Sequence, residues 1–150
     1  MFLTVHAASG IVIGQYLQNP LLAFITGLIF HYIFDIIPHG DTRVLEKYKN
    51  PIHIALAGII DLIVLLLFLI ILLGLKVDLL NFSIIAATFG AMLPDILQAF
   101  YYIYRGKIFT KTQYIHNLFH DMISKKHDMT LIPGLIFQFI ILIILTLIII

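Results

Sequence analysis

Histidine and aspartate recur in this sequence at spacings that place them on one face of a helix. His31 and Asp35 stand four residues apart, and so do His116 and His120. Residues at positions i and i+4 project from the same helical face. Helical pairs of this kind present metal ligands inside many helix bundles. The two pairs therefore predict a metal site built from imidazole and carboxylate groups.

The aspartates of the apolar stretches have no basic partner. Asp35, Asp61 and Asp95 lie in stretches that contain neither Lys nor Arg. A buried charge without a partner is costly, so each carboxylate must be protonated, paired with a histidinium or bound to a cation. The chain has seven His and no Cys, which makes Zn²⁺ the first choice and Mn²⁺ or Fe²⁺ the alternatives. One or two divalent ions would balance the aspartates.

The remaining candidates extend this set. We expect the metal ligands to come from one group of imidazoles and carboxylates: His6, His31, Asp35, His39, Asp95, His116 and His120. His53 is expected to be an additional ligand or an outer-shell group. Asp61 or Asp41 is expected to accept the proton of a metal-bound water.

The elements that carry these residues are predicted to be membrane helices. Of 150 residues, 61% are hydrophobic and 11% are charged, and the mean hydropathy is +1.08. Soluble domains carry about 25% charged residues. The net charge of +1 offers no basic field for nucleic acid. We therefore expect one all-α, membrane-embedded domain over residues 1–150, because helices satisfy their own backbone groups in lipid.

Five apolar segments are expected to form helices of a bundle, with four or five of them spanning the bilayer. They cover residues 2–17, 21–37, 51–75, 82–104 and 131–150, and a short cytoplasmic helix is expected at 112–124. Residues 2–17 either span the bilayer or lie half-buried at its surface. Gly10 and Gly14 share a face with His6 and would let neighbouring helices approach closely. The Ile/Leu-rich last segment is predicted to be a plain lipid-facing span.

The basic residues indicate the orientation. If the five segments alternate, one side holds eight of the nine Lys and Arg, and the other holds only Lys76. The positive-inside rule then places the N-terminus and the loops 38–50 and 105–130 in the cytoplasm, with the chain in a plasma or inner membrane. The His and Asp candidates fall in the same cytoplasmic half. Lipid is the expected partner, and a homo-oligomer is left open.

Four short motifs resemble those of the inner-membrane-associated, metal-dependent hydrolases of the YdjM-like group. They are TVHAASGIVIG, GLIFHYIFDIIPHGD, GAMLPDIL and IHNLFHD, which are similar to that group's Thr-x-His, His-x-x-x-Asp, Pro-Asp and double-His motifs. Here the double-His spacing is one residue shorter, and the His-x-x-x-Asp helix precedes the Pro-Asp segment. More distantly, the motifs resemble zinc-dependent phospholipase C and P1 nuclease. The resemblance implies a helical metal site and a phosphoester hydrolase.

Three functions fit these residues. The first is a metal-dependent hydrolase that acts on a phosphoester or ester of a lipid or lipid-linked substrate at the cytoplasmic leaflet. The second is a proton or divalent-metal transporter or channel, which is less favoured because the polar residues stop about halfway across the membrane. The third is a non-catalytic scaffold with a structural metal.

Overall fold

The computed structural model describes residues 1–40, 51–104, 107–123 and 127–150. Six helices and no strands are found in these ranges: α1 (Leu3–Tyr16), α2 (Pro20–Ile36), α4 (Pro51–Gly74), α5 (Phe82–Tyr104), α6 (Lys107–His120) and α8 (Leu131–Ile149). The expected all-α bundle is confirmed. The predicted bounds of the short helix were wrong, because α6 begins at Lys107 and ends at His120. The ring of Phe109 packs on Phe100 at 5.9 Å, which gives the early part of this helix a partner.

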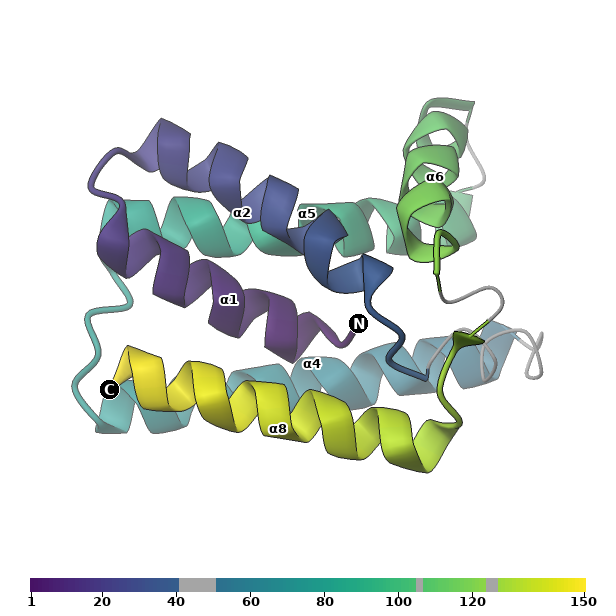
Figure 1. Cartoon of the computed structure of the whole chain (residues 1–150). Coiled ribbons are helices and arrows are strands. Elements are labelled where there is room, and N and C mark those ends of the chain that lie inside the picture. Colours follow the sequence, from purple (N-terminus) through teal and green to yellow (C-terminus); the bar gives the residue numbers. More distant parts are fainter. Residues whose placement is uncertain (41–50, 105–106, 124–126) are drawn as a thin grey trace.

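α1 and α2 form a tight helical hairpin. The side chain of Asn19 accepts hydrogen bonds from the backbone N–H groups of Leu21 and Leu22, at 3.0 and 3.1 Å. Pro20 occupies the first turn of α2, where its missing N–H costs nothing. This cap fixes the start of α2 and returns the chain alongside α1 (Figure 1).

α1 lies in the middle of the bundle. It contacts α2, α4, α5 and α8, and in Figure 1 it runs between α2 and α8. Most of its residues are buried, including three with polar side chains: Thr4, His6 and Ser9. A short helix enclosed on all sides in this way can carry polar groups into the interior of the bundle.

Glycines allow the central helices to approach closely. A Cβ atom on Gly14 would collide with the backbone of Ile84 in α5, and one on Gly10 would lie 2.5 Å from the Cα of Thr88. This confirms the close approach predicted for these two glycines. Gly27 of α2 meets the backbone of Ala87 in the same way. The backbones of α1, α2 and α5 are therefore in near-direct contact.

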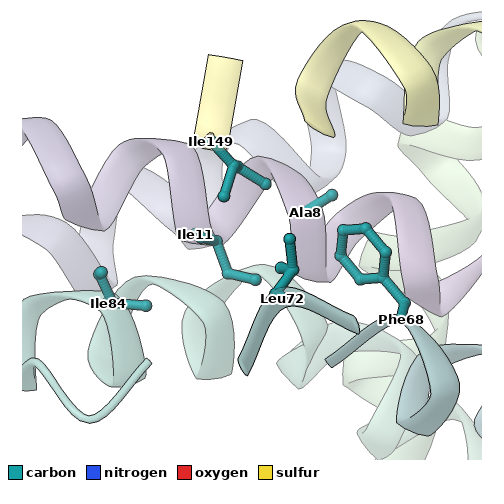
Figure 2. Close-up of a cluster of buried hydrophobic side chains, with 6 residues drawn as sticks. All are labelled: Ala8, Ile11, Phe68, Leu72, Ile84 and Ile149. Atoms are coloured by element: carbon teal, nitrogen blue, oxygen red, sulfur yellow. The ribbon is translucent and has the colours of Figure 1, made fainter. Parts of the chain in front are cut away.

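An apolar cluster fills the end of the bundle away from the N-terminus. Figure 2 shows its six side chains, which come from the middle of α1, the last turns of α4 and α8, and the start of α5: Ala8, Ile11, Phe68, Leu72, Ile84 and Ile149. The C-terminal halves of α2 and α5, which carry His31, Asp35 and Asp95, run toward the opposite end of the bundle (Figure 1). The bundle thus has an apolar end and a polar end.

Three of the described helices are long and apolar enough to cross a membrane. The qualifying stretches are Leu56–Gly74, Phe82–Tyr102 and Leu131–Ile149. α1 and α2 have 14 and 17 residues, or about 21 and 26 Å of helix, against a hydrocarbon core of ~30 Å. The expected four or five spans are therefore not supported. The lengths indicate three spans and a hairpin of two shorter helices.

The close contact between α2 and α5 can be tested with a matched pair of glycines. Gly27→Ala should destabilise the protein by about 1–3 kcal/mol, because the added methyl group overpacks the helix contact. Gly58→Ala is the control, since nothing lies within 4 Å of a Cβ at that position. Thermal unfolding of detergent-solubilised protein, followed by circular dichroism, measures the difference. Equal midpoints for the two variants would contradict the packing described here.

Candidate metal centre

Two imidazoles and two carboxylates meet at the polar end of the bundle. They are His31 and Asp35 of α2, Asp95 of α5 and His116 of α6. One donor atom from each residue can be chosen so that all four lie within 4.8 Å of one another. Three helices that are distant in sequence therefore build a group that could hold a metal ion.

The distances between donor atoms fit a single ion. Asp35 Oδ2 lies 3.1 Å from Nε2 of His31 and 3.2 Å from Nε2 of His116. Asp95 Oδ1 lies 3.3 Å from Nε2 of His116 and 3.8 Å from Nε2 of His31. Four donors arranged tetrahedrally around Zn²⁺ at about 2.0–2.1 Å are separated by about 3.3–3.4 Å. The three separations of 3.1–3.3 Å are close to this geometry, the fourth at 3.8 Å is wider, and all donors lie within 4.8 Å of one another.

Hydrogen bonding supports the same interpretation. Within the described part of the chain, the buried atoms His31 Nε2, Asp35 Oδ2 and His116 Nε2 have no well-oriented hydrogen-bond partner, although Asp35 Oδ2 lies within ion-pair distance of both nitrogens. Buried polar atoms are rarely left in this condition. Three of them directed at one point are what a bound cation would satisfy.

Neighbouring groups orient both imidazoles. His31 Nδ1 lies 2.7 Å from the carbonyl oxygen of Ala91 and donates its proton there, which leaves the Nε2 lone pair directed at the group. His116 Nδ1 lies 3.2 Å from the side-chain amide of Gln98. The amide nitrogen Nε2 of Gln98 is the atom that faces the ring, so it donates to Nδ1 of a neutral His116. Both histidines thus have the second contact that metal-binding imidazoles usually make.

The two carboxylates also face a second position. The other oxygen of Asp35, Oδ1, lies 3.1 Å from Nε2 of His6 and 2.6 Å from the Met1 amino group. Asp95 Oδ2 lies 3.8 Å from the same nitrogen of His6. The His6 ring stacks on His31 with centroids 4.1 Å apart. Each carboxylate therefore directs one oxygen at His31 or His116 and the other oxygen at a second position that could attract positive charge. His6 borders this second position.

The two carboxylates change the pKa of His116 in α6. Burial alone would lower the pKa of His116, but Asp35 and Asp95 outweigh burial and raise that pKa to about 9. The carboxylates thus favour positive charge at this point. A metal ion would compete with the proton on His116 for the same place.

His39 and His120 form an adjoining pair rather than part of the four-residue group. Their ring centroids lie 5.0 Å apart, and the ring of His120 lies 5.8 Å from that of His116. His39 Nδ1 lies 2.6 Å from the carbonyl oxygen of Ile37. Of the seven predicted ligands, the structure brings five together, namely the two carboxylates with His6, His31 and His116, and places these two beside them.

Asp61 lies apart from the group and caps α1. Its carboxylate accepts hydrogen bonds from the backbone N–H of Leu3 at 2.6 Å and from the hydroxyl of Thr4 at 2.9 Å. A carboxylate at a helix N-terminus is stabilised by the free N–H groups there. Its predicted role as proton acceptor stays a prediction. Asp41 and the side chain of His53 lie outside the described residues.

Two polar residues that were not predicted hold the turn that carries His39. Gln138 of α8 donates to the carbonyl of His39 at 2.9 Å and accepts from the N–H of Phe2 at 2.7 Å. Asp128 Oδ1 accepts from the N–H groups of His39 and Gly40, at 3.1 and 2.8 Å. The last segment is therefore more than a plain lipid-facing span, as its one Gln among Ile and Leu could have suggested.

Comparison with protein-family models, curated proteins and solved structures gives no match for this chain. The functional interpretation therefore depends on the residues and on the geometry described above.

Metal content provides a direct test of the group. Purified protein should contain one or two divalent ions per chain, and Asp35→Asn should lose most of them, because this carboxylate contacts both imidazoles of the group and His6. His127→Ala is the control, since that imidazole is exposed and outside the group. Elemental analysis measures the metal, and circular dichroism checks the fold. Wild-type metal content in Asp35→Asn would show that the ion binds elsewhere.

Proposed function

We propose that the protein is a membrane-embedded, metal-dependent hydrolase that cleaves a phosphoester or ester of a lipid or lipid-linked substrate at the cytoplasmic leaflet. The observation that carries this proposal is the convergence of His31, Asp35, Asp95 and His116, with three buried donor atoms that lack well-oriented hydrogen-bond partners. Nitrogen and oxygen donors without sulfur suit Zn²⁺ first, with Mn²⁺ or Fe²⁺ as alternatives. The phosphoester class comes from the motif resemblance.

The residues of the group have different roles in this proposal. A bound ion would supply a water of lowered pKa and would polarise the scissile group. His31 and His116, oriented by Ala91 and Gln98, hold the ion from the buried side. The side chain of Asp95 is 20% exposed, whereas those of His31 and Asp35 are fully buried. Substrate and water therefore approach the group from the side of Asp95.

The second position supports a two-ion version of the proposal. Asp35 and Asp95 each turn one oxygen toward His31 and His116 and the other toward His6. Carboxylates that bridge two ions are a common way to hold paired metals for hydrolysis. His6→Ala should then remove one ion of two and leave the other.

The depth of the group favours a lipid substrate. Asp95 lies nine residues before the end of α5 at Tyr104, which is about 14 Å at ~1.5 Å per residue. The outward face of α2, next to the group, is apolar, with Ile29 and Ile33 about half exposed. A soluble substrate would have to enter this apolar surrounding, whereas a lipid is already within it.

A structural metal in a non-catalytic scaffold is the second candidate. Four protein donors would complete a tetrahedral zinc site and leave no place for water. Detection of an exchangeable metal-bound water would favour the hydrolase. The transporter alternative gains no support from the far end of the bundle, where the described core is apolar (Figure 2).

Activity should depend on both metal and membrane substrate. In lipid nanodiscs, the wild-type protein should release the head group from a labelled phospholipid, lose this activity to a chelator and regain it with Zn²⁺.

Gln98→Leu should weaken metal affinity by about 10–100-fold, because loss of such an outer contact frees the ligand His116. Product release is followed by mass spectrometry. Full activity in metal-free protein would exclude the proposed chemistry.

The cytoplasmic placement of the group can be tested on this cysteine-free chain. A Cys introduced at Lys111 should react with a membrane-impermeant reagent only from the cytoplasmic side. A Cys at Leu80, which is 80% exposed in the turn between α4 and α5, should react only from the other side. The reverse pattern would contradict the orientation inferred from the basic residues.

A further inference from the structure

α6 has two faces with different surroundings. The inward face carries the buried residues Gln113 and His116, and Phe119 packs on Tyr32 of α2 at 4.8 Å. The outward face carries Tyr114 and Leu118, four residues apart, which are 69% and 53% exposed. The inward face thus belongs to the metal centre, while the outward face is apolar and uncovered by the rest of the described chain.

An apolar outward face is unusual for a helix in water. Helices at the surface of a soluble region turn charged and polar residues outward, and contiguous exposed apolar patches mark sites of interaction. On α6 the apolar stripe continues into the following turn, where Met122 is 64% exposed. Ile115 beside the stripe is 43% exposed. This face therefore requires an apolar environment.

The chemistry next to the stripe fits lipid head groups. Thr110, Lys111, Tyr114 and Ile115 line a surface hollow. A lysine and a tyrosine beside aliphatic side chains are typical of the boundary between head groups and acyl chains, and the lysine favours anionic lipid. The hollow is shallow and its lining is almost wholly apolar, so it offers a floor for an acyl chain, and Lys111 contributes a cation to the same face of α6.

The position of α6 in the fold agrees with this chemistry. The apolar stretch of α5 ends at Tyr102, and α6 begins at Lys107. Figure 1 shows α6 lying across the end of α5, at the end of the bundle that holds the N-terminus. α6 thus follows directly on the end of the apolar stretch of α5, where a span that crosses the membrane would reach the head groups.

We propose that α6 docks into the head-group region of an anionic phospholipid membrane through Lys111, Tyr114, Leu118 and Met122, and that this docking holds His116 in the metal centre. The second part rests on the proposed function, because it assigns His116 to the metal. His116 lies 3.2 Å from Asp35 Oδ2 and 3.3 Å from Asp95 Oδ1. It is the one residue of the four-residue group that comes from outside the spans and the hairpin, so α6 must stay in place for the group to be complete.

Membrane contact can be measured without any assay of metal or activity. Single cysteines at Tyr114 and Leu118, labelled with an environment-sensitive fluorophore, should be quenched by lipid-borne quenchers in nanodiscs of phosphatidylcholine and phosphatidylglycerol in equal parts. A cysteine at Asn117, an exposed polar residue at the edge of the same face, is the control and should be quenched less. Equal quenching at all three positions by a water-soluble quencher alone would overturn the docking. Disulfide cross-linking of two chains at Leu118 would overturn it in favour of a contact between copies.

The coupling to the metal centre needs a second measurement. The double variant Tyr114→Ser with Leu118→Ser should bind Zn²⁺ about 10-fold more weakly than the wild type in the same nanodiscs, as expected when a ligand loses its support. Asn117→Ser should bind normally, and circular dichroism checks that each variant keeps its helices. Unchanged affinity in a double variant that has lost lipid contact would overturn the coupling. Lipid contact by a protein that binds no Zn²⁺ would leave the docking intact and refute the metal centre.

The labels at Tyr114 and Leu118 should be quenched less in nanodiscs of phosphatidylcholine alone than in the mixed nanodiscs. Equal quenching in the two kinds of nanodisc would overturn the part of the proposal that assigns anionic lipid to Lys111.

Discussion

The structure is organised by the need to compensate aspartates inside apolar helices that contain no Lys or Arg. Asp61 receives the N–H and hydroxyl groups at the start of α1. The carboxylate of Asp35 lies within ion-pair distance of His6, His31, His116 and the Met1 amino group. Unpaired carboxylates in this setting would be costly. The first turns of α1 serve both needs, which explains why a short helix with polar side chains occupies the centre of the bundle.

Small residues make this compensation geometrically possible. The carboxylates and imidazoles can meet only if the backbones of α1, α2 and α5 lie very close together, and Gly14 and Gly27 remove the side chains that would prevent it. Gly134 does the same where α8 meets the turn at His39 and Gly40. The apolar cluster at the other end fixes the relative positions of the helices. The polar end therefore gathers the buried histidines and aspartates, while the apolar end packs the helices together.

Much of this arrangement could be predicted from the sequence. Hydropathy predicted the five apolar helices of the described chain, and the i, i+4 spacing of His31 and Asp35 indicated their shared face. The absence of basic partners drew attention to Asp95 as well. These inferences succeeded because periodicity and charge balance are local or compositional properties. They do not depend on which helix ends meet.

Most of the features that were missed depend on contacts between distant segments. Nothing near Asp61 in the sequence shows that it meets the start of α1, 58 residues away. Gln138 was hidden among Ile and Leu, and its partners at Phe2 and His39 lie more than 90 residues away. The number of spans was overestimated because the segments at 2–17 and 21–37 were counted as possible spans, although helices of 14 and 17 residues are shorter than the hydrocarbon core. Phe109 extends α6 through a contact with Phe100.

The central claim is that the histidines and aspartates of the polar end bind a metal ion together. Anomalous X-ray scattering from crystals of the protein, purified with its native metal, tests this claim most directly. A peak should lie between Nε2 of His31, Nε2 of His116 and the carboxylates of Asp35 and Asp95. Crystals that show these side chains in the described arrangement with no peak among them, or with metal only at an exposed imidazole such as His127, would contradict it.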